Sequence, residues 1–385
     1  MQCKNSLKNM TLAVLNYENT YGGLPPCTDA ETGSTPRFAN VDLIEPYLSW
    51  AVRVLPYVEE QTLADQFDLS LRADKQDVTL APGKNQMSAM MCPSDGAVGR
   101  VYSPDRRNPN LSFAKGNIVA YVSPEHVNGM RVYPGALINE VHPLARFTDG
   151  TTNTLMLTEV RTRDNANDPR GVWSAAYCGG SIISYDMHSS DDPIGTLQTR
   201  NADYNPFRNV DIDAFTPNST PTGNSDRLRE CPDREVADLE LMPCSVDNGT
   251  WTGASPRSMH PGGVNASLVD GSVTWLPDDI DRYLMIFTGQ STWTPDKAQQ
   301  WADVKDRLHN LSFVVNSPSP PRRHGSIEEA RAEYDKVKAI AEQLRSEFDN
   351  AYNGPRVTAT WLKWSGVGFF ALGIVANYGI KNPDE

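Results

Sequence analysis

Several motifs that mark common classes of enzyme are absent from this sequence of 385 residues. It has no Gly-x-Ser-x-Gly, no phosphate-binding loop and no dinucleotide-binding glycine fingerprint, so hydrolase and nucleotide-dependent chemistry lack a sequence basis. It also has no Cys-x-x-Cys pair and no His-x-x-x-His, which argues against a zinc ribbon, a thioredoxin-like site or a hydrolytic metal cluster. We therefore expect no enzymatic activity, no catalytic residues and no metal site.

Positive charge is also scarce. There are 35 Lys and Arg against 48 Asp and Glu, a net charge of −13, whereas binding to nucleic acid needs clustered cations along the phosphates. Nucleic acid is therefore not an expected partner, and the acidic surface suits a soluble extracytoplasmic domain. The hydrophobic content is 39%, with 28 Pro and 27 Gly, which indicates a loop-rich and largely β globular protein.

Apolar residues repeat with helical spacing at the start of the chain, at Cys3, Leu7, Met10, Val14 and Tyr17. This stripe predicts a helix that ends before the glycines and prolines of residues 22–26. We assign residues 1–25 to this helix and residues 26–290 to a β-rich domain. A second helix is expected around 49–67, strands around 117–123, 154–160 and 171–177, and a polar surface excursion over 186–250.

The segment from His260 to Trp275 predicts a β-hairpin. Asp270-Gly271 stands between two apolar runs, and this dipeptide favours a two-residue type I′ turn. Such a turn would pair Leu268 with Val273 and Ala266 with Trp275, and would place all four side chains on the buried face.

Four segments carry further motifs. In chain order they are Gln2–Tyr17 followed by Tyr21-Gly-Gly-Leu-Pro-Pro26, Cys92-Pro-Ser-Asp95, Phe147-Thr-Asp-Gly-Thr-Thr-Asn-Thr-Leu-Met-Leu-Thr-Glu159, and the His260 to Gly271 region. In this order they resemble a large bacterial prepilin-like family that is abundant in planctomycetes and ends in an H-x9-DG signature. The resemblance covers roughly residues 1–290. It implies a pilin-like α+β fold, and also a membrane helix upstream of Cys3 in relatives, so we expect that anchor to be missing from this sequence or lost in this member.

The resemblance gives the signature residues structural roles. These residues are His260, Pro261, Gly262, Gly263, Asp270, Gly271, Asp149, Gly150, Cys92 and Asp95. His260 is expected to fix the loop that leads into the hairpin. Ligand or metal binding by His260, and catalysis with Asp270, remain alternatives, although a turn aspartate one strand-length away is a doubtful partner.

Other polar residues give weaker signals. Calcium is the one cofactor considered, because 209–213 alternates oxygen ligands, but that segment lacks the glycine and terminal glutamate of an EF-hand. Residues 164–168 also fail the pattern, and both segments are expected to be solvated loops. Glu159 is expected to be an exposed charge at a strand end, and His188 with neighbouring aspartates is a weak metal signal.

The six cysteines permit disulfides. The best single prediction is Cys231–Cys244, which would close a short loop and stabilise the fold by roughly 3 kcal/mol in the chain-entropy model. The alternative is that several cysteines are free buried thiols in a reducing compartment.

Residues 291–355 are expected to be helical. Apolar residues from 327 to 348 follow an alternating three-four repeat, typical of a coiled coil or of one amphipathic helix packed on the domain. Residues 364–380 carry no charge and are flanked by tryptophans and lysines, which predicts a transmembrane anchor within 356–385, the alternative being a buried or interfacial hairpin.

Together these observations predict an α+β protein: an N-terminal helix, a β-rich pilin-like globular domain, and a helical C-terminal extension with a transmembrane segment. The leading hypothesis is a non-enzymatic cell-envelope protein, membrane-anchored with its main domain extracytoplasmic. It would be a pseudopilin-like structural or accessory subunit that associates with itself or with other proteins of a secretion or pilus-type assembly. The alternative is a membrane-tethered protein that binds a solute or glycan, which exposed tryptophans such as Trp173 or Trp251 would favour.

Overall fold

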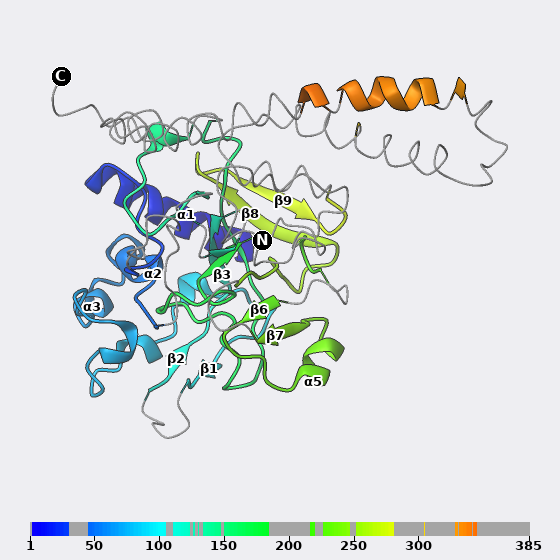
Figure 1. Ribbon diagram of the computed structural model, residues 1–385. Coiled ribbons are helices and arrows are strands. Elements are labelled where there is room, and N and C mark those ends of the chain that lie inside the picture. Colours follow the sequence, from blue (N-terminus) through cyan, green and yellow to red (C-terminus); the bar gives the residue numbers. More distant parts are fainter. Residues whose placement is uncertain are drawn as a thin grey trace, which may run out of the picture.

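The computed structural model describes residues 2–30, 45–104, 111–123, 126–127, 130, 134–147, 150–184, 216–219, 226–246 and 252–280, together with 304, 328–329, 331–340 and 342–344. These residues form an α+β fold with an N-terminal helix and a β-sheet domain (Figure 1). This confirms the predicted class. The predicted domain boundaries at 290 and 355 lie outside the described residues.

The N-terminal helix α1 spans Gln2–Tyr21 and confirms the predicted stripe, because Cys3, Leu7, Met10, Val14 and Tyr17 are all buried. The helix packs against three strands of the main sheet and two short 3₁₀ helices, Leu55–Val58 and Ser88–Met90. Figure 1 shows α1 lying beside β8. Burial of this apolar face, rather than helix propensity alone, is what stabilises a helix of this kind.

The main sheet has five strands in the order β5-β3-β4-β8-β9. Their bounds are β3 Ile118–Ser123, β4 Leu155–Glu159, β5 Ile182–Ser184, β8 Gly263–Leu268 and β9 Val273–Pro277. β3, β4, β8 and β9 pair in antiparallel fashion, whereas β5 runs parallel to β3. Every residue of β3, β4 and β5 is buried, so the centre of the sheet is covered on both faces.

Smaller elements surround this sheet. Two short pairs are β1 Val101–Tyr102 with β2 Phe113–Ala114, and β6 Asp226–Leu228 with β7 Cys244–Val246. The short helices are α2 Trp50–Arg53, α3 Gln61–Ala64 and α5 Arg234–Leu239. Further 3₁₀ turns are Ala73–Lys75, Pro82–Lys84 and Leu144–Arg146. In Figure 1, β6, β7 and α5 form a group of their own.

The hairpin exists, but its predicted register is wrong by one residue. Ser267 pairs with Val273 and Asn265 with Trp275, and Trp275 is 42% exposed. A type I′ turn needs φ > 0 at both central residues, and of this pair only Gly271 has it, with φ +88. The loop instead takes an extra residue, because Val269 is buried and donates its backbone N–H to the carbonyl of Thr154 at 2.9 Å.

Two other predictions also fail. The expected helix over 49–67 is broken into α2, a 3₁₀ turn that begins next to Pro56, and α3, and Glu59 between them has a left-handed backbone. The segment 171–177 makes only isolated bridges at Val172 and Ala175 instead of a strand. Its apolar residues are core residues of an irregular segment, and periodicity alone does not distinguish these from a short strand.

The described part of the predicted surface excursion is anchored by buried charges and a disulfide. Asp226 on β6 accepts hydrogen bonds from Arg170 at 2.9 Å and from Arg257 at 2.9 and 3.1 Å, and all three side chains are buried. Asp168 binds the other side of Arg170 at 2.7 Å. The structure also joins Cys231 to Cys244, the pair expected from the sequence. Residues 226–246 therefore belong to the body of the fold.

Residues 331–340 and 342–344 are helical, and Val337 and Leu344, two members of the predicted apolar repeat, are buried. Whether this helix forms a coiled coil stays a prediction. Within the described parts of the chain, no helix combines the length and apolar character needed to cross a bilayer. The predicted span over 361–380 lies outside those parts.

Candidate functional site

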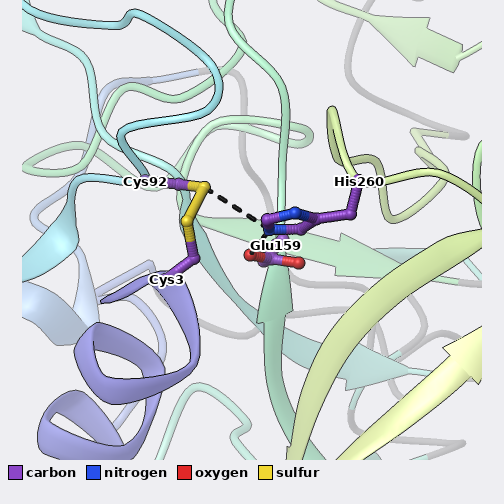
Figure 2. A group of neighbouring side chains, drawn as sticks. All are labelled: Cys3, Cys92, Glu159 and His260. Atoms are coloured by element: carbon purple, nitrogen blue, oxygen red, sulfur yellow. Dashed lines mark hydrogen bonds and ion pairs between the residues drawn. A yellow bond between two sulfur atoms is a disulfide. The ribbon is translucent and has the colours of Figure 1, made fainter. Parts of the chain in front are cut away.

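The four signature segments of the sequence meet at one place. Cys3, in the first turn of α1, forms a disulfide with Cys92. Glu159, at the end of β4, and His260, in the loop before β8, lie against this disulfide (Figure 2). One ligand atom from each of these four residues lies within 4.8 Å of all the others. We refer to Cys3, Cys92, Glu159 and His260 as the convergent cluster.

Cys92 is held in place by Asn117, which precedes β3. The Asn117 side-chain oxygen accepts the backbone N–H of Cys92 at 2.9 Å, and its amide nitrogen donates to Asp95 at 2.8 Å and to the carbonyl of Val160 at 3.0 Å. Asp95 also accepts from the backbone and the hydroxyl of Thr162 at 3.0 and 2.6 Å. The signature residues Cys92 and Asp95 thus tie their loop to the chain that follows β4.

Glu159 is not the exposed charge expected from the sequence, because only 2% of its surface is accessible to solvent. One carboxylate oxygen accepts two hydrogen bonds from Asn265 on β8, from the backbone N–H at 2.7 Å and the side-chain amide at 3.0 Å. Burial raises the pKa of Glu159 above its usual value, against the opposing effects of these hydrogen bonds and of the His260 charge. The other oxygen lies 3.2 Å from Nε2 of His260.

His260 is the most exposed member of the convergent cluster, with 23% of its side chain accessible. Its Nε2 lies 3.6 Å from Sγ of Cys92 and faces the Glu159 carboxylate. Its backbone N–H donates to the hydroxyl of Ser258 at 3.0 Å, and that hydroxyl donates to the carbonyl of Gly263 at 2.7 Å. His260 thus makes a backbone hydrogen bond within the entry loop, and its structural role there stays a prediction, while the imidazole is directed at the sulfur and the carboxylate.

The glycines after His260 allow the loop to approach β9. Gly262 has φ +85, and its carbonyl accepts the backbone N–H of Asp278 at 3.0 Å. A Cβ on Gly263 would lie closer than 3.0 Å to the carbonyl oxygen of Leu276 and to the ring of Trp275. Only a residue without a side chain fits there. Pro261, between these residues and His260, is exposed.

The Asp270-Gly271 turn docks on the segment that follows Gly150. Asp270 donates its backbone N–H to the carbonyl of Thr151 at 3.0 Å, and its carboxylate accepts the N–H of Ser272 at 2.8 Å. Lys8 of α1 donates to the carbonyl of Gly271 at 2.5 Å. Gly150 has φ +89, whereas Asp149 lies outside the described residues. Asp270 is thus engaged in its own turn, away from the convergent cluster.

The remaining candidates divide between corrections and untested predictions. Asp168, expected in a solvated loop, is buried. Burial alone would raise its pKa, but the Arg170 charge and hydrogen bonds, together with Lys115, lower it. Trp173 is buried as well, and its Nε1 donates to the carbonyl of Asn85 at 2.9 Å. The possible calcium segment 209–213, Trp251 and His188 lie outside the described residues.

Sequence reasoning missed the Cys3–Cys92 disulfide, the burial of Glu159 and the role of Asn265. A usable signal existed, since each of the four signature segments contributes one residue with a metal-ligating or redox-active side chain. The convergent cluster combines two sulfurs, a carboxylate and an imidazole, a donor set suited to thiol–disulfide exchange and to binding borderline-soft metals.

Comparison with known proteins identifies a family but no characterised relative. A family model described as "Protein of unknown function (DUF1559)" matches residues 1–283. No curated protein and no solved structure matches the chain. The matched residues include all four members of the convergent cluster.

Proposed function

This chain belongs to the DUF1559 family, and from that premise and the geometry of α1 we propose that it is a non-enzymatic structural subunit of a cell-envelope assembly, of the pseudopilin-like kind. In this proposal α1 packs against neighbouring subunits, and the sheet domain is displayed outside the cytoplasm.

The way in which α1 is held carries the proposal. One face is buried on the sheet, the first turn is linked covalently to the body by Cys3–Cys92, and Lys8 holds the hairpin turn. The helix therefore forms one rigid unit with the sheet domain. A force applied to the helix near Cys3 is transmitted to the body through a covalent bond, which suits a load-bearing connection.

The outer face of α1 suits packing against another helix. A second stripe with four-three spacing is exposed, and it consists of Asn5, Asn9, Leu12, Asn16 and Asn19. These side chains carry no charge, so covering them requires no desolvation of ions, and asparagine amides can hydrogen-bond across a helix pair.

Two disulfides support an extracytoplasmic location. Cys3–Cys92 and Cys231–Cys244 both form in the structure, and disulfides persist in oxidising compartments and are rare in the cytosol. The net charge of −13 suits a soluble domain exposed to the exterior.

Site-specific photocrosslinking in cells that express the natural gene tests the proposal. A photoreactive amino acid would replace Asn9 or Asn16 on the exposed stripe of α1, and Leu239 on α5, which is 83% exposed, serves as the matched control. We expect protein–protein crosslinks from positions 9 and 16 and few from position 239.

Two results would contradict the proposal. The first is that the protein stays an uncrosslinked monomer with the photoreactive residue at either α1 position. The second is that position 239 gives the same protein–protein crosslinks as positions 9 and 16. A monomer whose melting temperature rises with a particular glycan or small solute would support the alternative of a solute-binding protein. The short name of the family model, SBP_bac_10, has the form of a name for solute-binding proteins and favours that alternative. Trp173, one of the two tryptophans whose exposure would favour it, is buried.

A further inference from the structure

We propose that the convergent cluster is a redox-gated metal site: when the Cys3–Cys92 disulfide is reduced, the two thiolates, Glu159 and His260 bind one tetrahedral divalent cation of the zinc class. This goes beyond the structural role proposed above and does not depend on it.

The donor set and its geometry fit such an ion. Tetrahedral zinc takes Cys sulfur at about 2.3 Å and His nitrogen or carboxylate oxygen at about 2.0–2.2 Å, so neighbouring donor atoms lie about 3.3–3.8 Å apart. In the structure, Nε2 of His260 is 3.6 Å from Sγ of Cys92 and 3.2 Å from the Glu159 oxygen. All four ligand atoms already lie within 4.8 Å of one another. On reduction the two sulfurs would separate by roughly 1.7 Å from their bonded distance.

Neighbouring residues hold the ligands as they do in metal sites. Asn265 occupies one oxygen of Glu159 with two hydrogen bonds and leaves the other directed at His260. Asn117 fixes the backbone at Cys92, and Ser258 fixes the backbone at His260. Hydrogen bonds of this kind orient metal ligands, and their loss typically costs about 10–100-fold in metal affinity.

A disulfide that serves only as a structural crosslink needs no carboxylate or imidazole oriented beside it. Cys231–Cys244 provides the comparison: among the described residues, the convergent cluster is the only group of His, Cys, Asp and Glu with ligand atoms close enough to hold a metal. Placing a buried carboxylate beside a neutral disulfide is unfavourable, and Nε2 of His260 lies 3.2 Å from that carboxylate. A divalent cation bound to two thiolates and this carboxylate would offset that burial.

The conversion is balanced if a dithiol acts as the reductant. The dithiol gives two electrons to the Cys3–Cys92 bond and becomes a disulfide, the two cysteine sulfurs become thiolates bound to the cation, and two protons are released. The sulfurs are nearly buried, whereas His260 is partly exposed, so the cation would enter from the His260 side.

Cobalt(II) provides a direct probe, because tetrahedral thiolate-bound cobalt has intense visible bands and a thiolate-to-cobalt charge-transfer band. The full chain carrying Cys231→Ser and Cys244→Ser would be reduced without oxygen and titrated with cobalt(II) alone, then with zinc(II) in competition. We expect one cobalt per chain after reduction and none before it. His260→Ala and Glu159→Gln, each added to this background, should weaken binding at least tenfold.

Two outcomes would overturn the proposal: absence of the tetrahedral cobalt spectrum in the reduced protein, or unchanged affinity in both the His260 and Glu159 variants. If the double serine background does not fold, the same titration of the otherwise unmodified reduced chain, with and without His260→Ala, gives the answer, since Cys231 and Cys244 contribute equally to both. Neither outcome alters the crosslinking result that tests the structural proposal.

Discussion

The two disulfides should stabilise the protein unequally. Cys3–Cys92 joins residues 89 apart in the sequence, whereas Cys231–Cys244 joins residues 13 apart. In the chain-entropy model the loss of unfolded-state entropy grows with the logarithm of loop length, which gives about 4.6 kcal/mol for the first bond and about 3 kcal/mol for the second. Replacing both cysteines of the long loop by serine should therefore destabilise the fold by about 1.6 kcal/mol more than the same change in the short loop.

Guanidinium unfolding of the oxidised double variants, followed by tryptophan fluorescence, measures this difference. The variant without Cys3–Cys92 should have the lower midpoint, with a similar slope. The midpoints of the fully reduced proteins should converge, because no crosslink remains. Equal midpoints, or a lower midpoint for the short-loop variant, would contradict this difference in stabilisation. Such a result would mean that Cys3–Cys92 does not constrain the unfolded chain as a structural crosslink does.

Three further perturbations test other parts of the structure. Burial lowers the pKa of His142 from 6.5 to about 4. On acidification, the His142 imidazole therefore takes up a proton at a higher pH in the unfolded chain than in the folded protein. Stability should then fall by about 3 kcal/mol between pH 7 and 4, and urea unfolding of His142→Gln should show a smaller loss. Asp226→Asn leaves the buried Arg170 and Arg257 without their shared carboxylate. It should lower the free energy of unfolding, measured with denaturant, by about 3–5 kcal/mol. The control Arg72→Ala should lower it by less than about 1 kcal/mol, because the ion pairs of Arg72 are partly exposed. Gly263→Ala should cost about 2 kcal/mol or more through contact with β9, and an unchanged melting temperature would contradict the close approach.

The sequence was informative where one face of an element is buried. The stripe from Cys3 to Tyr17 predicted α1, and alternating or continuous apolar runs predicted β3, β4 and the presence of a hairpin. These are local patterns set by burial, and they do not depend on which distant segment provides the cover.

The sequence was uninformative where distant segments determine the result. Glu159 follows an apolar run and was expected at an exposed strand end, but Asn265 and His260, more than 100 residues away, cover it. Asp168 and Asp226 were expected in polar loops because their arginine partners cannot be identified from local pattern. The hairpin register failed for the same reason, since Val269 docks on the turn at Thr154.

We propose that the Cys3–Cys92 disulfide fixes α1 to a body that lies outside the cytoplasm. Fractionation of native cells under thiol-blocking conditions, followed by non-reducing peptide mass spectrometry, tests it directly. We expect the protein in the envelope fraction, with the Cys3 and Cys92 peptides linked. Recovery from the cytosol with both cysteines blocked as free thiols would contradict it.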